Sequence, residues 1–353
     1  MTPTIKPFSI GPIKIDFPFW LSPMAGYTDL PFRLLCREFG APYTITEMML
    51  DRLLLVRGRV KSRMFHLTDQ DHPVGGQIIG SDPAIMAKAA VELCQMGFDV
   101  IDLNFACPVR KALRRRRGGW MMNTPRETVE VIKAVVAAVD RPVTCKLRQR
   151  FKDKDTLDDF WEIAEGAFSA GAAALCVHAR SVEACYHGKA DWAFLAEVKR
   201  RFPDKTILGS GDIGQPAKAI AMLQETGVDG VAVARGALGN PWFFRQVRDL
   251  LEGREMYRPT IPEQRAVLLR HFDACCELYG PLKGSKQMRG FGVKYARMHA
   301  RPKEVRVAFV NVKSSRDWRA VLDRFYPADG VLPPPAPAGT GWDGQTHDST
   351  HLE

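Results

Sequence analysis

The chain has 353 residues, 46% of them apolar and 25% charged, the balance of an ordinary globular protein. This composition excludes a mostly disordered chain and a fibrous one, and the length fits one large domain with a smaller appendage. The sequence holds no run of the roughly 18 apolar residues that a membrane helix needs, and its first residues lack the order of a secretion signal. We therefore expect no membrane segment and a cytoplasmic location. The net charge of +10 favours a polyanionic partner.

Short apolar runs bounded by turn residues alternate with stretches of helical periodicity between residues 15 and 240. The predicted strands span residues 19–24, 43–48, 74–80, 100–105, 142–147, 173–178, 206–211 and 230–235. The predicted helices span residues 31–39, 50–56, 83–97, 125–139, 157–170, 191–202 and 215–227. Eight apolar strands alternating with helices predict an α/β fold, a closed (β/α)8 TIM barrel. A Rossmann fold would place GxGxxG after the first strand, where the sequence reads SPMAGYTD instead.

From about residue 258 the pattern changes to one helix after another, which predicts a small C-terminal all-helical domain over residues 258–330. The barrel is assigned to residues 1–250. Residues 331–353 are rich in proline and glycine, and we expect this tail to be disordered.

Positive charge is concentrated in two places. Between residues 281 and 325 there are twelve Lys or Arg against three Asp or Glu, and residues 110–117 hold six positive charges in eight positions. These clusters favour nucleic acid over an acidic membrane surface as the partner. A solvated helix face is the alternative for either cluster.

The eight cysteines show no CxxC pair and no spacing typical of a metal site. We expect reduced thiols, most of them acting as small apolar side chains, and no metal ion.

Polar and reactive residues recur at the C-terminal ends of the predicted strands, the end of a TIM barrel where its chemistry takes place. They are Pro23, Met24, Ala25, Gln77, Asn104, Cys107, Lys146, His178, Arg180, Ser210, Gly211, Asp212, Ala234 and Arg235. Core packing does not explain this recurrence. The glycine turns after strands seven and eight let backbone N–H groups approach a phosphate, with Arg235 adding a charged contact.

Several of these side chains have more than one reading. Lys146 suits a Schiff base, a cation facing an electron-rich ring or anion, or an interior salt bridge. His178 could belong to the active site, or it could be a core histidine whose ring nitrogens are hydrogen-bonded within the protein. Gln77 and Asn104 suit amide contacts to a heterocycle or bridges between strands.

Cys107 follows a strand, in a loop whose backbone Pro108 restrains, whereas Cys145 and Cys176 lie within strands. Arg110 and Lys111 are near in sequence and would favour its thiolate. A thiol with an ordinary pKa of about 8.5 is nevertheless mostly protonated near neutrality, so Cys107 can also donate a proton.

With these residues in place, the sequence resembles the tRNA-dihydrouridine synthase family over nearly all of residues 18–245. The matching segments occur in family order. They are SPMAGYTDLPFR (22–33), the strand with Gln77, DLNFACPVRK (102–111), RRGGWMM (116–122), PVTCKLR (142–148), VHAR (177–180), ADW (190–192), GSGDI (209–213) and VARGALGNPWFF (233–244). The region with Arg297, Met298 and His299 resembles the family's RNA-binding domain more loosely.

The resemblance implies an oxidoreductase that uses FMN and NADPH to reduce the C5–C6 double bond of particular uridines in tRNA. Cys107 would be the general acid that protonates C5. The residues implied to line the flavin are Pro23, Met24, Ala25, Gln77, Lys146 and His178, with Ser210, Gly211, Asp212, Ala234 and Arg235 at its phosphate. Asn104, Arg180, Arg289 and Lys294 are expected on the uracil or RNA side, and a monomer is expected.

Two positions depart from the family pattern. Ser210 stands where Asn is frequent, and Ala234 stands where Gly is common. Three rival functions stay open at this point. They are an FMN barrel acting on a free pyrimidine, a Schiff-base aldolase using Lys146, and a non-catalytic RNA chaperone.

Overall fold

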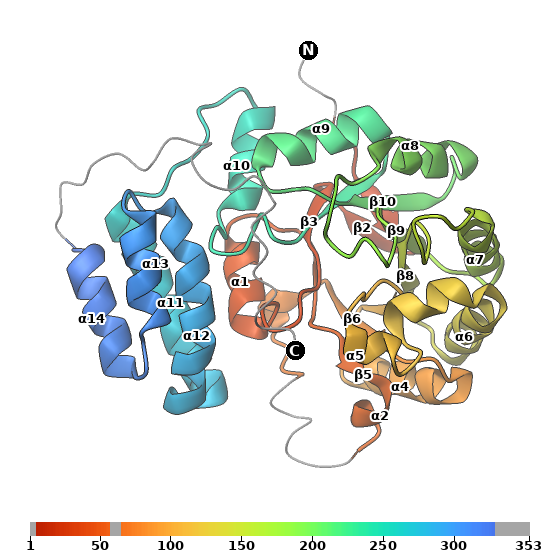
Figure 1. The fold of residues 1–353 in the computed structure, drawn as a ribbon, viewed down its shortest axis with the longest axis horizontal. Helices are drawn as coiled ribbons and strands as arrows, with labels where there is room; N and C mark the ends of the chain where they lie inside the picture. Colours follow the sequence, from red (N-terminus) through yellow and green to blue (C-terminus); the bar gives the residue numbers. More distant parts are fainter. Residues whose placement is uncertain (1–4, 57–64, 329–353) are drawn as a thin grey trace.

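A closed barrel of eight parallel strands forms the centre of the molecule (Figure 1). The computed structural model describes residues 5–56 and 65–328. The barrel strands are β3 (Phe19–Leu21), β4 (Thr44–Ile45), β6 (Val74–Ile79), β7 (Val100–Asn104), β8 (Val143–Arg148), β9 (Ala174–His178), β10 (Thr206–Ser210) and β11 (Gly230–Val233). Strands β6 to β11 pair in chain order, β3 pairs with β11, and β4 closes the ring by pairing with β3 and β6. The predicted TIM barrel is confirmed.

The second predicted strand, residues 43–48, is wrong in one respect. It is interrupted after β4, and a further short strand, β5 (Met49–Leu50), pairs with the end of β6. At the interruption the Thr46 hydroxyl, rather than a backbone carbonyl, accepts the N–H of Gln77 at 3.3 Å. A side chain thus replaces one rung of the ladder, which a hydrophobicity pattern does not reveal.

Helices cover the outside of the barrel, as the predicted alternation required (Figure 1). They are α1 (Leu30–Glu38), α2 (Asp51–Leu54), α4 (Pro83–Gln95), α6 (Pro125–Ala138), α7 (Asp158–Ser169), α8 (Trp192–Arg201), α9 (Pro216–Thr226) and α10 (Phe243–Leu251). Shorter turns are η1 (Asp69–Asp71), α5 (Arg110–Leu113) and η2 (Gly118–Asn123). The start of α4 shows the local cause: Asp82 accepts the N–H of Ile85, and Pro83 occupies the first turn.

A β-hairpin that the sequence patterns did not predict lies against the interior of the barrel. Its strands are β1 (Phe8–Ile10) and β2 (Ile13–Ile15). Phe8 packs into a second hydrophobic cluster with inward-facing strand residues such as Trp20 and Leu208. Glycine at position 230 permits this contact, because a Cβ there would lie 2.9 Å from the Phe8 ring.

Residues beyond 260 form the expected helices. They are α11 (Ile261–Tyr279), α12 (Pro281–Tyr295), η3 (Ala296–Met298), α13 (Pro302–Val310) and α14 (Ser315–Phe325). Capping boxes at Thr260 and Ser314 fix the starts of α11 and α14. Phe272 and Trp318 stack at 5.1 Å between ring centroids in the interior of this bundle. The predicted tail, residues 331–353, lies outside the described residues.

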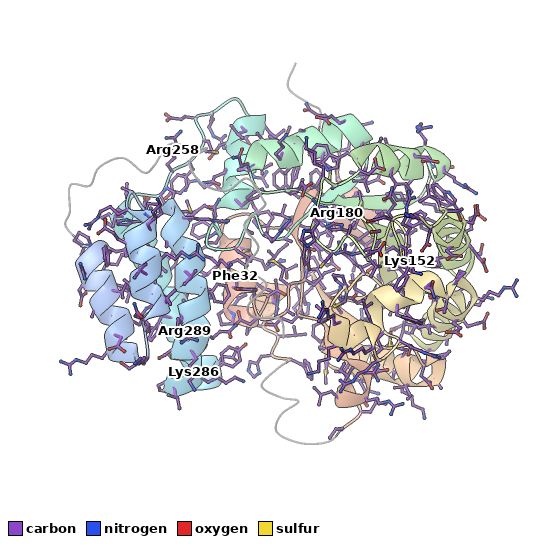
Figure 2. All side chains as sticks on the ribbon, viewed as in Figure 1. Phe32, Lys152, Arg180, Arg258, Lys286 and Arg289 are labelled. Atoms are coloured by element: carbon purple, nitrogen blue, oxygen red, sulfur yellow. The ribbon has the colours of Figure 1, made fainter. Side chains whose placement is uncertain are left out.

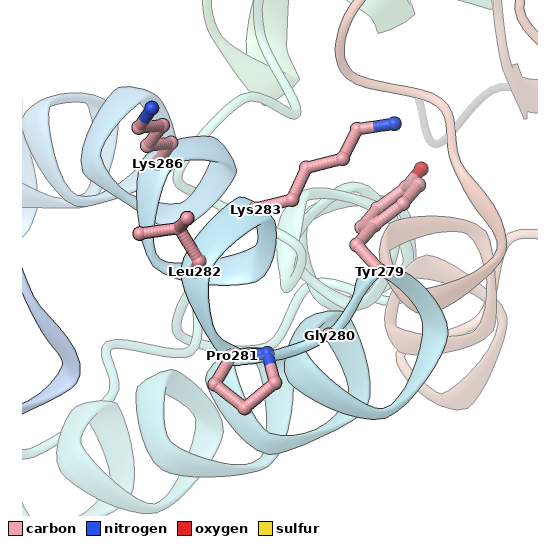
Figure 3. Close-up of a pocket in the computed structure, with 6 residues that line it drawn as sticks. All are labelled: Tyr279, Gly280, Pro281, Leu282, Lys283 and Lys286. Carbon is pink, nitrogen blue, oxygen red and sulfur yellow. The ribbon is translucent and has the colours of Figure 1, made fainter.

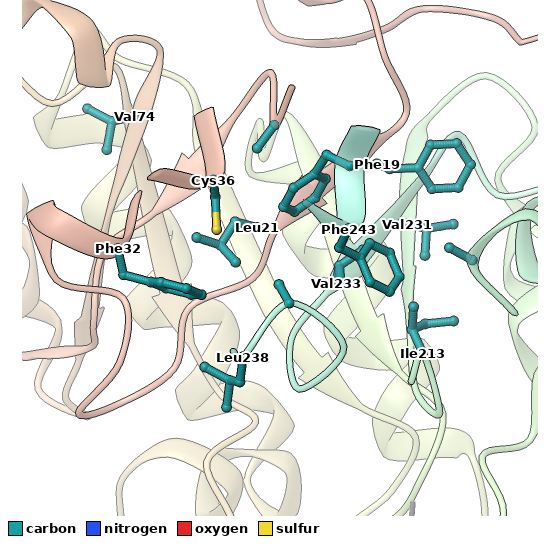
Figure 4. Close-up of a cluster of buried hydrophobic side chains, with 14 of the residues drawn as sticks. Phe19, Leu21, Phe32, Cys36, Val74, Ile213, Val231, Val233, Leu238 and Phe243 are labelled. Carbon is teal, nitrogen blue, oxygen red and sulfur yellow. The ribbon is translucent and has the colours of Figure 1, made fainter. Parts of the chain in front are cut away.

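The helical region is docked on the barrel through α1. One continuous cluster of buried apolar side chains includes Leu21 of β3, Phe32 of α1 and Phe291 of α12, and Figure 4 shows its part around β3, α1 and β11. The Phe32 ring lies 5.2 Å from that of Phe291. An ion pair between Arg270 and Glu38 at 2.9 Å closes the edge of the seam. The helices of the C-terminal region and the barrel are therefore held by a shared core.

Candidate active site

The polar residues predicted at the strand ends come together at the carboxyl end of the barrel. Lys146 projects from β8 and is 9% exposed, and its Nζ donates to Cys176 Sγ and Ser210 Oγ, both at 3.1 Å. Within residues 5–56 and 65–328, no carboxylate oxygen pairs with this ammonium at 4.0 Å or less. The interior salt bridge is therefore not the explanation for Lys146. A buried cation with only neutral partners suits an anionic or electron-rich ligand.

A chain of amide hydrogen bonds fixes Gln77 and Asn104. The Asn104 amide donates to Gln77 Oε1 at 2.8 Å, and the Gln77 amide donates to Asp102 Oδ2 at 2.6 Å. Asp102 also accepts the Thr144 hydroxyl at 2.6 Å. Burial raises the pKa of Asp102 to about 6. Asp102 escaped the sequence prediction because it lies among apolar residues within a strand.

Asn104 also fixes the loop that carries Cys107. Its Oδ1 accepts the N–H groups of Ala106 at 3.1 Å and of Cys107 at 2.9 Å. Both ends of the Asn104 amide are thus engaged by the protein. If Asn104 contacts a uracil edge as expected, its amide must do so while it also bonds Gln77 and the Ala106 and Cys107 N–H groups.

The Cys107 thiol is buried, with 8% of the residue exposed. Gly119 donates its N–H to the Cys107 carbonyl at 2.9 Å, and a Cβ at Gly118 would lie 2.9 Å from the Cys107 Cβ. Burial raises the pKa of this thiol, and only Arg148 among the cations opposes the shift. The idea that Arg110 and Lys111 favour a thiolate is wrong, because both are exposed on α5 and the thiol is buried away from them.

Arg148 is a site residue that the sequence patterns did not single out. It is 2% exposed, and its guanidinium donates to the carbonyls of Ala106 at 2.9 Å and Cys185 at 2.6 Å. It also faces the Tyr186 ring at 5.5 Å. Arg148 therefore ties the Cys107 loop to the loop after β9.

His178 and Arg180 carry nitrogen atoms with unmet hydrogen-bonding capacity. His178 Nδ1 and Arg180 Nη1 are buried and have no hydrogen-bond partner among the described residues. Burial and the neighbouring cations, Arg148 foremost, lower the pKa of His178 well below its usual range, so the ring is neutral. Arg180 donates to Asp212 at 2.5 Å and is 4% exposed, so it is buried beside the loop after β10 (Figure 2).

The loops after β10 and β11 have the shape expected of a phosphate cradle. Gly211 has a φ of 135°, and a Cβ there would lie 2.6 Å from that of Ala190. A Cβ at Gly236 would lie 2.5 Å from the carbonyl oxygen of Ile213. Asp212 adopts the left-handed φ of 58° and turns its carboxylate to Arg180 and to the Ala190 N–H, at 2.7 Å. The Ser210 hydroxyl accepts a hydrogen bond from the Lys146 Nζ at 3.1 Å.

The remaining predicted residues surround this cradle. Pro23, Met24 and Ala25 form a turn after β3 in which Met24 O accepts the N–H groups of Tyr27 and Thr28. Ala234 directly follows β11, and its carbonyl accepts the Ala237 N–H at 3.0 Å. The Arg235 guanidinium lies 5.3 Å from the Tyr186 ring centroid.

These residues fit a flavin mononucleotide. Buried nitrogens on His178 and Arg180 require a partner, and a bound molecule would supply it. A buried ammonium stands beside them, and glycine-lined loops adjoin them. An anionic heteroaromatic molecule with a phosphate group satisfies all three features.

One group of described residues, Asp29, His271 and Cys275, has the composition of a metal site. Asp29 is nevertheless already satisfied: it caps α1 through the Phe32 N–H at 3.2 Å and accepts the Tyr279 hydroxyl at 3.1 Å. The Cys275 thiol points to the same oxygen at 4.0 Å. Asp29 is thus engaged in a hydrogen-bonded seam between α1 and α11, and the His271 Nε2 has no hydrogen-bond partner among the described residues; we assign the cluster no metal.

Basic side chains occupy the bend between α11 and α12. Tyr279, Lys283 and Lys286 line a pocket of about 390 Å³ there, and Figure 3 shows Lys283 and Tyr279 projecting to the same side. Arg289 is exposed one turn further along α12 (Figure 2). Lys294 is half-exposed, and its backbone packs on Gly239 of the barrel.

A second basic surface lies on and after α5. Arg114, Arg115 and Arg116 are exposed, whereas Arg117 is half-buried and lies 3.9 Å from Asp51. Figure 1 places α5 and α12 on different sides of the barrel. Among the helices of the described part, none is long and apolar enough to cross a membrane.

Solved structures share this barrel. A 2-naphthoyl-CoA reductase complex aligns over 70% of this chain and 52% of that chain, with a TM-score of 0.56 and 14% identity. An old yellow enzyme homologue from Zymomonas mobilis aligns over 74% of this chain and 95% of that chain, with a TM-score of 0.52 and 15% identity. At sequence identities of 14% and 15%, these two structures establish only the fold. The class of protein that they define is the (β/α)8 barrel.

Sequence comparison gives the family. The family model described as dihydrouridine synthase (Dus) matches residues 20–326. The tRNA-dihydrouridine synthase B of Pseudomonas aeruginosa is 34% identical over 322 residues, which cover 91% of this chain and 92% of that protein. The protein of the same name from Escherichia coli K12 is 33% identical over 319 residues, which cover 90% of this chain and 98% of that protein. The chain belongs to the dihydrouridine synthase family.

Proposed function

We propose that this protein reduces the C5–C6 double bond of specific uridines in tRNA to dihydrouridine, with FMN as cofactor and NADPH as electron donor. The observation that carries the proposal is a buried, protonated Cys107 thiol in a barrel mouth that also holds the Lys146, His178 and Arg180 cradle. Family membership and the tRNA named for the curated relatives support the same substrate. The cytoplasmic location and the monomeric state stay predictions.

The reaction adds one hydride and one proton across the double bond. Reduced FMN would supply the hydride to C6. Cys107 would give its proton to C5, and the resulting thiolate would regain a proton from solvent. Because its pKa is raised, the Cys107 thiol would stay protonated until it transfers its proton to C5 of the uracil. Asn104 and Arg148 would hold the Cys107 loop in place by the bonds described above.

The cradle residues would bind the cofactor and stabilise charge. Lys146, with neutral partners only, would face the electron-rich edge of the flavin ring. His178, neutral and with a free Nδ1, would meet a polar atom of the ring. The phosphate would lie at the Gly211 and Gly236 loops, with Arg180 and Arg235 supplying positive charge.

The target base must leave its stack to enter the barrel mouth. The bend at Lys283 and Lys286, Arg289 on α12, and the arginines after α5 would hold the tRNA backbone on different sides of the barrel. Contacts to phosphates position the RNA without reading its sequence. A free pyrimidine, the second candidate substrate, would leave both basic surfaces without a role.

The direct test of the product is nucleoside mass spectrometry. Unmodified tRNA is incubated with the protein, FMN and NADPH, then digested, and dihydrouridine is quantified. We expect dihydrouridine at one or a few positions of the tRNA. Absence of dihydrouridine in tRNA, with free uracil or uridine reduced under the same conditions, would replace the proposal by the small-molecule alternative.

A further inference from the structure

Arg297 reaches from the helical region into the loop that follows β11. It lies in η3, directly after α12, and is half-buried. Its Nη2 donates to the Gly236 carbonyl at 2.8 Å, and its Nη1 to the Arg235 carbonyl at 3.4 Å. Burial lowers the pKa of Arg297 only to about 10, so the guanidinium is charged at neutral pH. These are charge-assisted bonds to the backbone of the phosphate loop.

The loop has little freedom on either side of these bonds. Gly239 has a φ of 68°, and any Cβ there would collide with the backbone of Lys294 and Tyr295 in the helical region. Gly236 lies against the carbonyl of Ile213, in the loop after β10. Residues 234–240, which form the loop after β11, are therefore held between the loop after β10 and the end of α12.

The direction of the Arg297 bonds has a consequence for the opposite face of the loop. A trans peptide holds its C=O and N–H on opposite sides. When the Arg235 carbonyl points to Arg297, the Gly236 N–H of the same peptide points away from Arg297. Backbone N–H groups so directed are the donors that bind phosphate in glycine-rich loops.

We propose that Arg297 is a positioning residue for the phosphate end of the flavin, which it serves by presetting the Arg235–Gly236 backbone without touching the ligand. The inference rests on the proposed function in one respect, that FMN is the cofactor. It adds that the helical region is part of the cofactor site, so that flavin affinity depends on how α12 and η3 are docked on the barrel. A residue on the RNA side thereby supports the redox site.

The test separates the phosphate from the ring. Flavin is removed from the full-length protein, and the apoprotein is titrated with FMN and with riboflavin, which lacks the phosphate, by quenching of flavin fluorescence. For Arg297→Met we expect the Kd for FMN to rise about 10-fold or more, since two charge-assisted bonds are lost. The Kd for riboflavin is expected to stay within about twofold of the wild-type value, because the ring contacts are elsewhere. Arg297→Lys keeps one donor and the charge, and should lie between.

Arg301→Met is the matched control, because Arg301 is exposed nearby and pairs with Glu304 at 3.4 Å; its two Kd values should equal those of the wild type. Circular dichroism verifies that each variant is folded, and Arg297→Lys alone decides the matter if Arg297→Met does not fold. The inference is overturned if the folded Arg297 variants keep the wild-type ratio of the two Kd values. This holds whether both Kd values are unchanged or both rise by the same factor. A wild-type protein that binds neither flavin would instead refute the proposed function.

Discussion

Cys107 shows how burial decides the chemistry of a thiol. Nearby positive charge in the sequence favours the thiolate, but in the structure the thiol is packed beneath Gly118 and Gly119 and its pKa is raised. Desolvation penalises the charged form, and Arg110 and Lys111, exposed on α5, are screened by water. The thiol therefore keeps its proton at neutral pH, as the proposed general acid must, and is a poor nucleophile.

Replacing Cys107 with alanine should separate the two halves of the reaction. Flavin binding and reduction by NADPH do not involve the thiol, so both should be unchanged. Uridine reduction should fall about 100-fold or more, the usual contribution of a general acid. The measurement is dihydrouridine formed in a single turnover. Cys276→Ala, a half-buried thiol on α11, is the control, and equal turnover in Cys107→Ala and wild type would contradict the general-acid role.

The pH dependence of that turnover follows from the same shift. The pKa of Cys107 is raised, so its acid form persists through the ordinary thiol pKa of about 8.5. We expect the single-turnover rate to stay level from about pH 7 to about pH 9 and to fall only above that. A rate that falls between about pH 6 and about pH 8 would show a lowered pKa, contrary to the structure.

At the scale of the elements, the barrel strands were the most predictable part. Six of the eight begin and end within two residues of the predicted positions, because strands buried on both faces are apolar throughout, whereas β3 and β4 each end three residues earlier than predicted. The β1–β2 hairpin was missed, since three-residue strands show too little periodicity. Asn104 was recognised as a site residue, yet its capping of the Cys107 loop depends on neighbours from three strands. Arg148 was not singled out, because only the fold shows that its guanidinium bridges the loops after β7 and β9.

Helix α12 should contribute to RNA binding through its exposed face. Arg289→Glu reverses a charge there without touching the barrel mouth, so tRNA affinity should fall about 10-fold at low salt while NADPH oxidation is unchanged. The loss should shrink as salt increases. Arg126→Glu, on the exposed face of α6, is the matched control and should leave affinity unchanged. If Arg289→Glu and Arg126→Glu bind tRNA equally well, the helical region has another role.

At the scale of the whole molecule, the seam between barrel and helical region contains a buried acid, Asp29. Burial, reinforced by Glu47 and opposed by Arg33, raises the pKa of Asp29 to about 7. In the unfolded chain its pKa is about 3.9. Between about pH 4 and about pH 7, Asp29 is protonated in the folded protein but ionised in the unfolded chain. The contribution of Asp29 to the free energy of unfolding therefore falls as pH rises through this range, and it is constant above about pH 7.

Asp29→Asn removes that dependence while keeping an acceptor for the Phe32 N–H. The difference in Tm between Asp29→Asn and wild type should therefore shift in favour of the variant as pH rises from about 5 to about 8. Thermal unfolding at several pH values, with Asp273→Asn on the exposed face of α11 as control, measures it. A difference that stays constant with pH would mean that Asp29 is ionised in the folded protein.

In the proposed function, one site of the whole molecule serves a flavin, a nicotinamide donor and tRNA. The most direct measurement is an anaerobic absorption spectrum of the flavin-loaded protein, first with NADPH and then with unmodified tRNA. We predict that the flavin bands bleach with NADPH, and that they recover on addition of tRNA but not of free uridine. Recovery with free uridine alone, or no flavin bound even after incubation with FMN, would contradict the account.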